Sequence, residues 1–185
     1  MSQFAIVPGS VSAIAKQSGK SIAETFLSVE MVILIDVSGS MACHDSRGGK
    51  SSYEVALEEL AKLQANNPGK LGIIAFSSNP VFCPGGQPDL MGGGTNLTGA
   101  LDFAKVADTG DMRFVVISDG EPDDDTTALT RAQSYKGRID TVYVGPEGGS
   151  GSEFMQLLAK RKGGMSLTAA KAQELAAATT LLLSR

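Results

Sequence analysis

Five oxygen-bearing side chains are spaced in a pattern that suits a hard divalent cation. They lie in an Asp-Val-Ser-Gly-Ser segment, directly after a run of three glycines, and in a Ser-Asp-Gly segment; they are Asp36, Ser38, Ser40, Thr95 and Asp119. Mg²⁺ and Mn²⁺ prefer oxygen ligands, whereas zinc and copper favour sites that include nitrogen or sulfur. The pattern therefore predicts a site for Mg²⁺ or Mn²⁺, with Ca²⁺ as a further candidate.

Both aspartates come at the end of apolar runs rich in β-branched residues. Met-Val-Ile-Leu-Ile precedes Asp36, and Phe-Val-Val-Ile-Ser precedes Asp119. Such runs are typical of the buried strands of a parallel sheet. Since open α/β sheets bind ligands at the carboxyl ends of their strands, we expect both carboxylates at one edge of the sheet. Taken alone, each aspartate could instead cap the helix that follows it.

Strands and helices alternate from residue 29 onward. The apolar runs predict strands at about 30–35, 71–76, 80–83, 113–118, 139–144 and 164–167. Helical spacing predicts helices at about 51–65, 97–107, 126–136, 152–162 and 170–183. We therefore expect an α/β fold: a Rossmann-like, doubly wound, mostly parallel six-stranded sheet with helices on both faces. The third strand follows turn-rich residues and is expected to be a short antiparallel edge strand.

Residues 1–28 precede this alternating region and are expected to form an N-terminal extension to a main domain at 29–185. Their apolar positions follow helical spacing, at Val11, Ile14, Ala15, Ile22 and Phe26. This spacing predicts a short amphipathic helix. It would pack on the flank of the domain or, alternatively, dock a partner.

Composition excludes several classes of protein. The net charge of −4 disfavours nucleic-acid binding, which needs a basic face. No apolar run approaches the length of a membrane span, and the N-terminus does not read as a signal peptide. The two cysteines, Cys43 and Cys83, favour a reduced cytoplasmic protein with unpaired thiols. A disulfide stays open as an alternative, because both cysteines are expected in loops on the same side of the sheet.

The five oxygen-bearing residues resemble the metal-ion-dependent adhesion site of the von Willebrand factor A (vWA) domain. That family's pattern is Asp-x-Ser-x-Ser, then a threonine, then an aspartate, and each position is filled here. The resemblance covers about residues 29–183. It implies that the strand before Asp36 lies beside the strand before Asp119. It also implies that a bound Mg²⁺ keeps one position for an Asp or Glu carboxylate of a partner protein.

The resemblance further implies an intracellular adaptor that takes part in protein–protein interaction. Compact bacterial proteins of this type often work with AAA+ ATPases, so the resemblance implies an AAA+ ATPase system as a partner class. It implies neither nucleic acid nor a membrane as a partner. Residues around the five ligands are then expected to contact the partner. These are His44, Asp45, Arg47, Asn96, Glu121 and Asp123.

Two further features surround the predicted ion. Gly92, Gly93 and Gly94 could let Thr95 move toward or away from the metal, or could simply form a flexible loop. Residues 121–125 read Glu-Pro-Asp-Asp-Asp. These acids could stabilise a helix N-terminus, or could form a negative rim that selects a carboxylate flanked by Lys or Arg.

We predict no catalysis. The Gly-Lys-Ser at 19–21 lacks the upstream glycine of a phosphate-binding loop, because Ile14 occupies that position. A serine hydrolase would need a base and a Gly-x-Ser-x-Gly turn, and the latter is missing. Two alternatives stay open: a metal-dependent phosphate-ester hydrolase, and a structural subunit whose ion only braces the loops.

Overall fold

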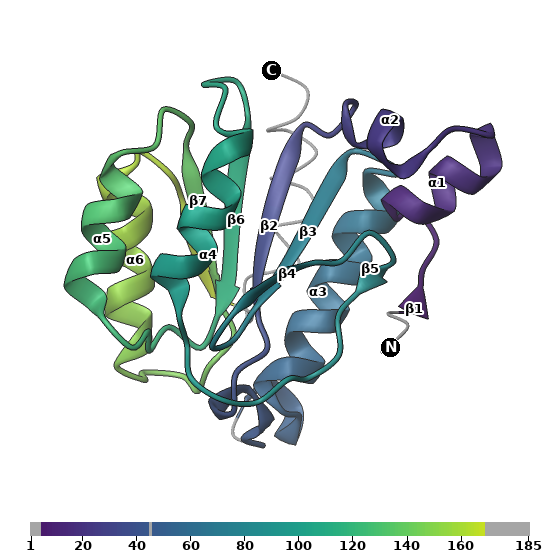
Figure 1. The fold of residues 1–185 in the computed structure, drawn as a ribbon. Coiled ribbons are helices and arrows are strands. Elements are labelled where there is room, and N and C mark those ends of the chain that lie inside the picture. Colours follow the sequence, from purple (N-terminus) through teal and green to yellow (C-terminus); the bar gives the residue numbers. More distant parts are fainter. Residues whose placement is uncertain (1–4, 45, 169–185) are drawn as a thin grey trace.

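The computed structural model describes residues 5–44 and 46–168, and its centre is a six-stranded sheet (Figure 1). In spatial order its strands are β4 (Pro80–Phe82), β3 (Leu71–Phe76), β2 (Met31–Asp36), β6 (Arg113–Ser118), β7 (Ile139–Tyr143) and β8 (Ser166–Thr168). All neighbouring strands are parallel except β4, which runs antiparallel to β3 at the edge. The predicted mostly parallel sheet with one short antiparallel edge strand is confirmed.

The longer helices flank this sheet. They are α3 (Ser52–Asn66), α4 (Leu97–Ala104), α5 (Asp125–Gln133) and α6 (Gly151–Arg161). Figure 1 shows α3 on one face and α4, α5 and α6 on the other. Short 3₁₀ turns follow β2 and α4: η1 (Ser40–Ala42), η2 (Arg47–Gly49) and η3 (Lys105–Ala107). The helix predicted at 97–107 therefore tightens into 3₁₀ geometry in its last turn, and the helix predicted at 170–183 lies outside the described residues.

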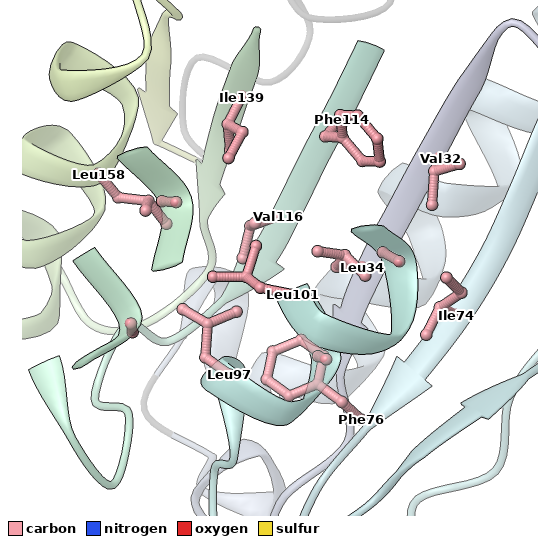
Figure 2. Packing of buried hydrophobic residues seen from close by; sticks show 14 of the residues in the cluster. Val32, Leu34, Ile74, Phe76, Leu97, Leu101, Phe114, Val116, Ile139 and Leu158 are labelled. Carbon is pink, nitrogen blue, oxygen red and sulfur yellow. The ribbon is translucent and has the colours of Figure 1, made fainter. Parts of the chain in front are cut away.

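Alternate residues of the central strands supply two apolar layers. In β2, Val32 and Leu34 face the layer under α4, α5 and α6, whereas Ile33 and Ile35 face the layer under α3. Figure 2 shows the first layer, in which Leu101 of α4 lies among side chains from the strands. Because successive side chains of a strand point to opposite faces, a strand covered on both sides must be apolar throughout. Coverage on both faces explains why the runs before Asp36 and Asp119 are apolar without interruption.

The N-terminal region differs from the single helix predicted for it. It forms two helices, α1 (Val11–Ser18) and α2 (Ile22–Phe26). The break has a local cause: Gly19 adopts φ 67° at the end of α1, and Ser21 and Glu24 form a reciprocal capping box that starts α2. These signals override the continuous apolar spacing that predicted one helix.

A small second sheet fastens the N-terminal region to the domain. Its strands are β1 (Ala5–Ile6) and β5 (Gly86–Gln87), which pair antiparallel. The amide of Val7 continues the contact by donating to the carbonyl of Gly85 at 2.9 Å. The sequence analysis did not predict this pairing. In the part of the chain that the structure describes, no helix is long and apolar enough to cross a membrane.

Candidate metal centre

Strand register brings the ends of the strands that lead to Asp36 and Asp119 to one edge of the sheet. Ile35 of β2 pairs with Ile117 of β6, so that Asp36 and Ser118 end adjacent strands side by side. Three loops carry the remaining residues: two follow these strand ends, and the third, which follows the second sheet, contacts the first loop. We call them loop 1 (residues 37–40), loop 2 (residues 88–96) and loop 3 (residues 119–124).

The carboxylate of Asp36 is the most firmly held group of the site. Its side chain is 0% exposed. Oδ1 accepts a hydrogen bond from the amide of Ser38 at 2.9 Å, and Oδ2 accepts one from the hydroxyl of Ser118 at 2.7 Å. The Ser118 hydroxyl in turn accepts from the amide of Gly120 at 2.9 Å. Ser118 therefore links loop 3 to Asp36, a role that the sequence analysis missed although this serine directly precedes Asp119.

The electrostatic setting of Asp36 favours a bound cation. Burial raises the pKa of the Asp36 carboxyl to about 6, despite hydrogen bonds from Ser118 and Ser38 that lower it, and the negative charge of Asp119 raises it further. A divalent cation between these two carboxylates would stabilise the ionised form of both. The two neighbouring carboxylates therefore suit the divalent cation that the sequence pattern predicts.

The two serine hydroxyls have a spacing that fits one small ion. The Oγ atoms of Ser38 and Ser40 lie 3.1 Å apart. Neighbouring ligands of an octahedral Mg²⁺, each about 2.1 Å from the ion, are separated by about 3 Å. Ser38 is buried whereas Ser40 is exposed, so the pair spans the boundary between the sheet and the solvent. Among the described residues no three His, Cys, Asp or Glu side chains form a possible metal site.

Backbone hydrogen bonds hold loop 2 against loop 1. The carbonyl of Val37 accepts from the amides of Met91 and Gly92, and the amide of Gly39 donates to the carbonyl of Gly93 at 3.1 Å. Gly92 and Gly93 adopt φ of 69° and 83°, a region that favours glycine. These glycines thus shape the turn that delivers Thr95, which is only 6% exposed, to the site.

The residues predicted to contact a partner fall into three groups. Half-buried Asn96 and exposed Asp123 form hydrogen bonds within the protein: Asn96 caps α4 by accepting from the amide of Gly99, and Asp123 accepts from the amide of Thr95. His44 and Glu121 are exposed, and Glu121 accepts from the hydroxyl of Ser150 at 2.5 Å. Asp45 lies outside the described residues, and only the backbone of Arg47 is described, in η2.

The acidic run does not form a uniform rim. Asp124 caps α5, because its carboxylate accepts from both the amide and the hydroxyl of Thr127, at 2.9 and 2.7 Å. These bonds lower the pKa of Asp124. Asp125 begins the first turn of the same helix, where a negative charge is favourable. For these two acids the structure fits the helix-capping alternative.

A cleft of about 290 Å³ opens beside the candidate metal centre. Ser40 and Asp119 line one part of it. The rest of the wall is formed by Cys43, Ser52, Glu121, Tyr143, Pro146, Gly149 and Ser150. Most of these residues carry no motif, so the sequence analysis could not predict the cleft.

The two cysteines are both free and lie in opposite environments. Cys43 is exposed beside the cleft, whereas Cys83 is buried in the apolar layer under α3. The disulfide left open by the sequence is therefore not formed. Burial raises the pKa of the Cys83 thiol to about 11.

We expect a thiol reagent such as Ellman's reagent to titrate one cysteine in the native protein and both in denaturant. Cys43 should react quickly, because thiolate formation needs access to water, and Cys83 should react only on unfolding. Serine at Cys43 should remove the fast phase and serine at Cys83 should not. Equal native rates for the two thiols would contradict the burial of Cys83.

Comparison with solved structures identifies the architecture. A von Willebrand factor type A protein from Catenulispora acidiphila is similar over 81% of this chain and 41% of its own, with 18% identity and a TM-score of 0.59. The chain has the fold of a vWA domain. An aerotolerance-related membrane protein from Bacteroides fragilis is similar over 81% of this chain and 96% of its own, with 20% identity and a TM-score of 0.66.

A third similar structure is described as carrying manganese. It is the manganese-loaded TRAP protein from Plasmodium vivax, which is similar over 73% of this chain and 63% of its own, with 17% identity and a TM-score of 0.56. Scans against protein-family models and curated proteins found no match. At these identities the likeness of the vWA domain to its structural neighbours establishes the fold, and the chemistry must be argued from its own residues.

Proposed function

We propose that this vWA domain binds another protein through a divalent metal ion. Asp36, Ser38, Ser40, Thr95 and Asp119 would hold Mg²⁺ or Mn²⁺, with Ca²⁺ as a weaker candidate. The observation that carries the proposal is the environment of Asp36, a fully buried carboxylate whose pKa is raised by burial and by the charge of Asp119. The manganese described for one structural neighbour adds support at the level of the fold.

The chemistry of the ligand set indicates what the ion would do. Three neutral hydroxyls and two carboxylates leave a divalent cation with residual Lewis acidity, and Mg²⁺ seeks six oxygens. Ser40 is exposed, so an open position would face solvent. We propose that an Asp or Glu carboxylate of the partner fills it. An AAA+ ATPase system is the partner class that the resemblance to compact bacterial vWA proteins favours.

Exposed groups around the ion would contribute specificity. His44 and Glu121 are proposed partner contacts, as are Asp45 and Arg47, which follow His44 closely in the sequence. We propose no catalysis by this domain. Its one histidine, His44, is exposed. A phosphate-ester hydrolase would need a general base held close to the ion. We propose that exposed His44 does not serve as one.

We expect a partner to be captured from the native lysate in excess Mg²⁺ and lost in EDTA. Capture should also fail with Asp119→Ala, because the ion would then be bound too weakly to bridge two proteins. Mass spectrometry of the eluted proteins is the measurement, and Asp111→Ala, an exposed carboxylate at the opposite end of β6, is the matched control. A partner indifferent to both EDTA and Asp119 would contradict metal-bridged recognition and would favour an ion that only braces the loops.

A further inference from the structure

Loop 3 returns to loop 2 at Asp123. The Oδ1 atom of Asp123 accepts a hydrogen bond from the amide of Thr95 at 2.9 Å. In the other direction, the amide of Asp123 donates to the carbonyl of Thr95 at 3.0 Å. We call this reciprocal pair of bonds the clasp. It joins the loop that carries Thr95 to the loop that carries Asp119.

The residue before Thr95 gives independent evidence for the clasp. A Cβ atom at Gly94 would lie 2.9 Å from Oδ2 and 3.1 Å from Oδ1 of Asp123. Gly94 is not among the glycines with positive φ, unlike Gly92 and Gly93. Backbone conformation therefore does not require glycine at position 94. A side chain at position 94 would instead have to displace the Asp123 carboxylate from its place beside Thr95.

The neighbours of Asp123 are engaged elsewhere. Asp124 caps α5 through Thr127, and Glu121 accepts from Ser150. Loop 1 is tied to loop 2 through backbone atoms, at Val37 and Gly39. Of these acids, Asp123 alone is placed to fix Thr95 relative to loop 3.

We propose that Asp123 is a positioning residue that holds Thr95 at the metal centre without touching the ion. This inference rests on the proposed metal site. Three glycines precede Thr95, and glycine has the largest conformational freedom to lose on ordering. The clasp removes that freedom before the ion arrives. Loss of groups that orient metal ligands typically lowers metal affinity 10–100-fold.

The first test compares Mn²⁺ affinity, measured by calorimetry, for the wild-type chain, Asp123→Ala, Asp123→Asn and Asp124→Ala. Asp123→Ala should weaken binding about 10–100-fold. Asp123→Asn keeps an acceptor oxygen and should stay within about threefold of wild type. Asp124→Ala removes the same charge one residue along, so it should lower the melting temperature through loss of a helix cap while leaving Mn²⁺ affinity within about threefold.

The second test disturbs the clasp from Gly94, first in the wild-type chain and then in the Asp123→Ala background. Gly94→Ala should displace the carboxylate and weaken Mn²⁺ binding as Asp123→Ala does. In the Asp123→Ala background the same substitution should have little further effect, because the clash is gone. Such non-additivity in a double-mutant cycle is expected of two residues in contact. Additive losses would overturn the proposed steric link and with it the clasp.

Hydrogen exchange separates failure of the clasp from failure of the metal site. In EDTA, the Thr95 amide should exchange faster in Asp123→Ala than in wild type or Asp124→Ala. If wild type binds Mn²⁺ but Asp123→Ala binds equally well, the positioning role is overturned and the metal site stands. If wild type binds no Mn²⁺, the proposed function fails and the positioning role fails with it, whatever the exchange rate shows.

Discussion

Alanine at Asp119 is expected to lower Mn²⁺ affinity at least about 100-fold while leaving the domain folded. Even groups that only orient ligands are worth 10–100-fold, and Asp119 is proposed to supply one of only two negative charges to the ion. The apoprotein should tolerate the change. The charge of Asp119 raises the pKa of buried Asp36, so its removal relieves a repulsion in the ion-free state.

The measurement pairs a Mn²⁺ titration with thermal melts in EDTA. The melting temperature of Asp119→Ala should stay within about 3 °C of wild type, which corresponds to about 1 kcal/mol for a chain of this size. Asp111→Ala should match wild type in both. Native Mn²⁺ affinity in Asp119→Ala would show that the site is assigned to the wrong residues, and loss of cooperative unfolding would show that Asp119 has a structural role instead.

The second large effect is a dependence of apoprotein stability on pH. The pKa of Asp36 is raised to about 6 in the folded protein, from 3.8. Between these values the folded state binds more protons than the unfolded state, so the free energy of unfolding falls as pH rises through this window. The contribution of Asp36 should be about 1.4 kcal/mol greater at pH 5 than at pH 7, approaching about 3 kcal/mol below pH 4.

Urea unfolding in EDTA at several pH values measures this dependence. Asp36→Asn is the reference, because asparagine keeps the shape and cannot titrate, and the difference between the two proteins isolates Asp36 from other groups. In saturating Mg²⁺ the sign should reverse, since the proton and the ion compete for the same carboxylate. Identical pH profiles for the two proteins in EDTA would contradict the raised pKa.

The sequence predicted the sheet well because its strands are covered on both faces. The runs before Asp36 and Asp119 must be apolar at every position, and that signal survives without knowledge of the tertiary structure. The helix at 97–107 was predicted as one element, whereas its last turn becomes η3. There Lys105 pairs with Asp108, and Asp108 also accepts from the amides of Lys136 and Gly137. Such a contact from a distant segment leaves no local pattern.

In the candidate site, too, some features can be predicted from the sequence and others depend on contacts between distant segments. Residue types and the ends of strands were enough to select Asp36 and Asp119, because strand ends meet at one edge of a parallel sheet. The roles of Ser118 and Asp123 depend on hydrogen bonds between loops that are far apart in the chain. No spacing rule contains that information. The break between α1 and α2 was different, since Ser21 and Glu24 have the spacing of a capping box and could have been recognised.

The pairing of β1 with β5 has a consequence for the order in which the chain folds. These two-residue strands are separated along the chain by β2, α3, β3 and β4, so their contact closes a long loop for few hydrogen bonds. Contacts of this kind form late and open early. The amide of Ser12 also donates to the carbonyl of Pro84, which extends the same attachment. Transient detachment of the N-terminal region would therefore uncover residues 84–87, from which loop 2 leads to Thr95, while the main sheet stays intact.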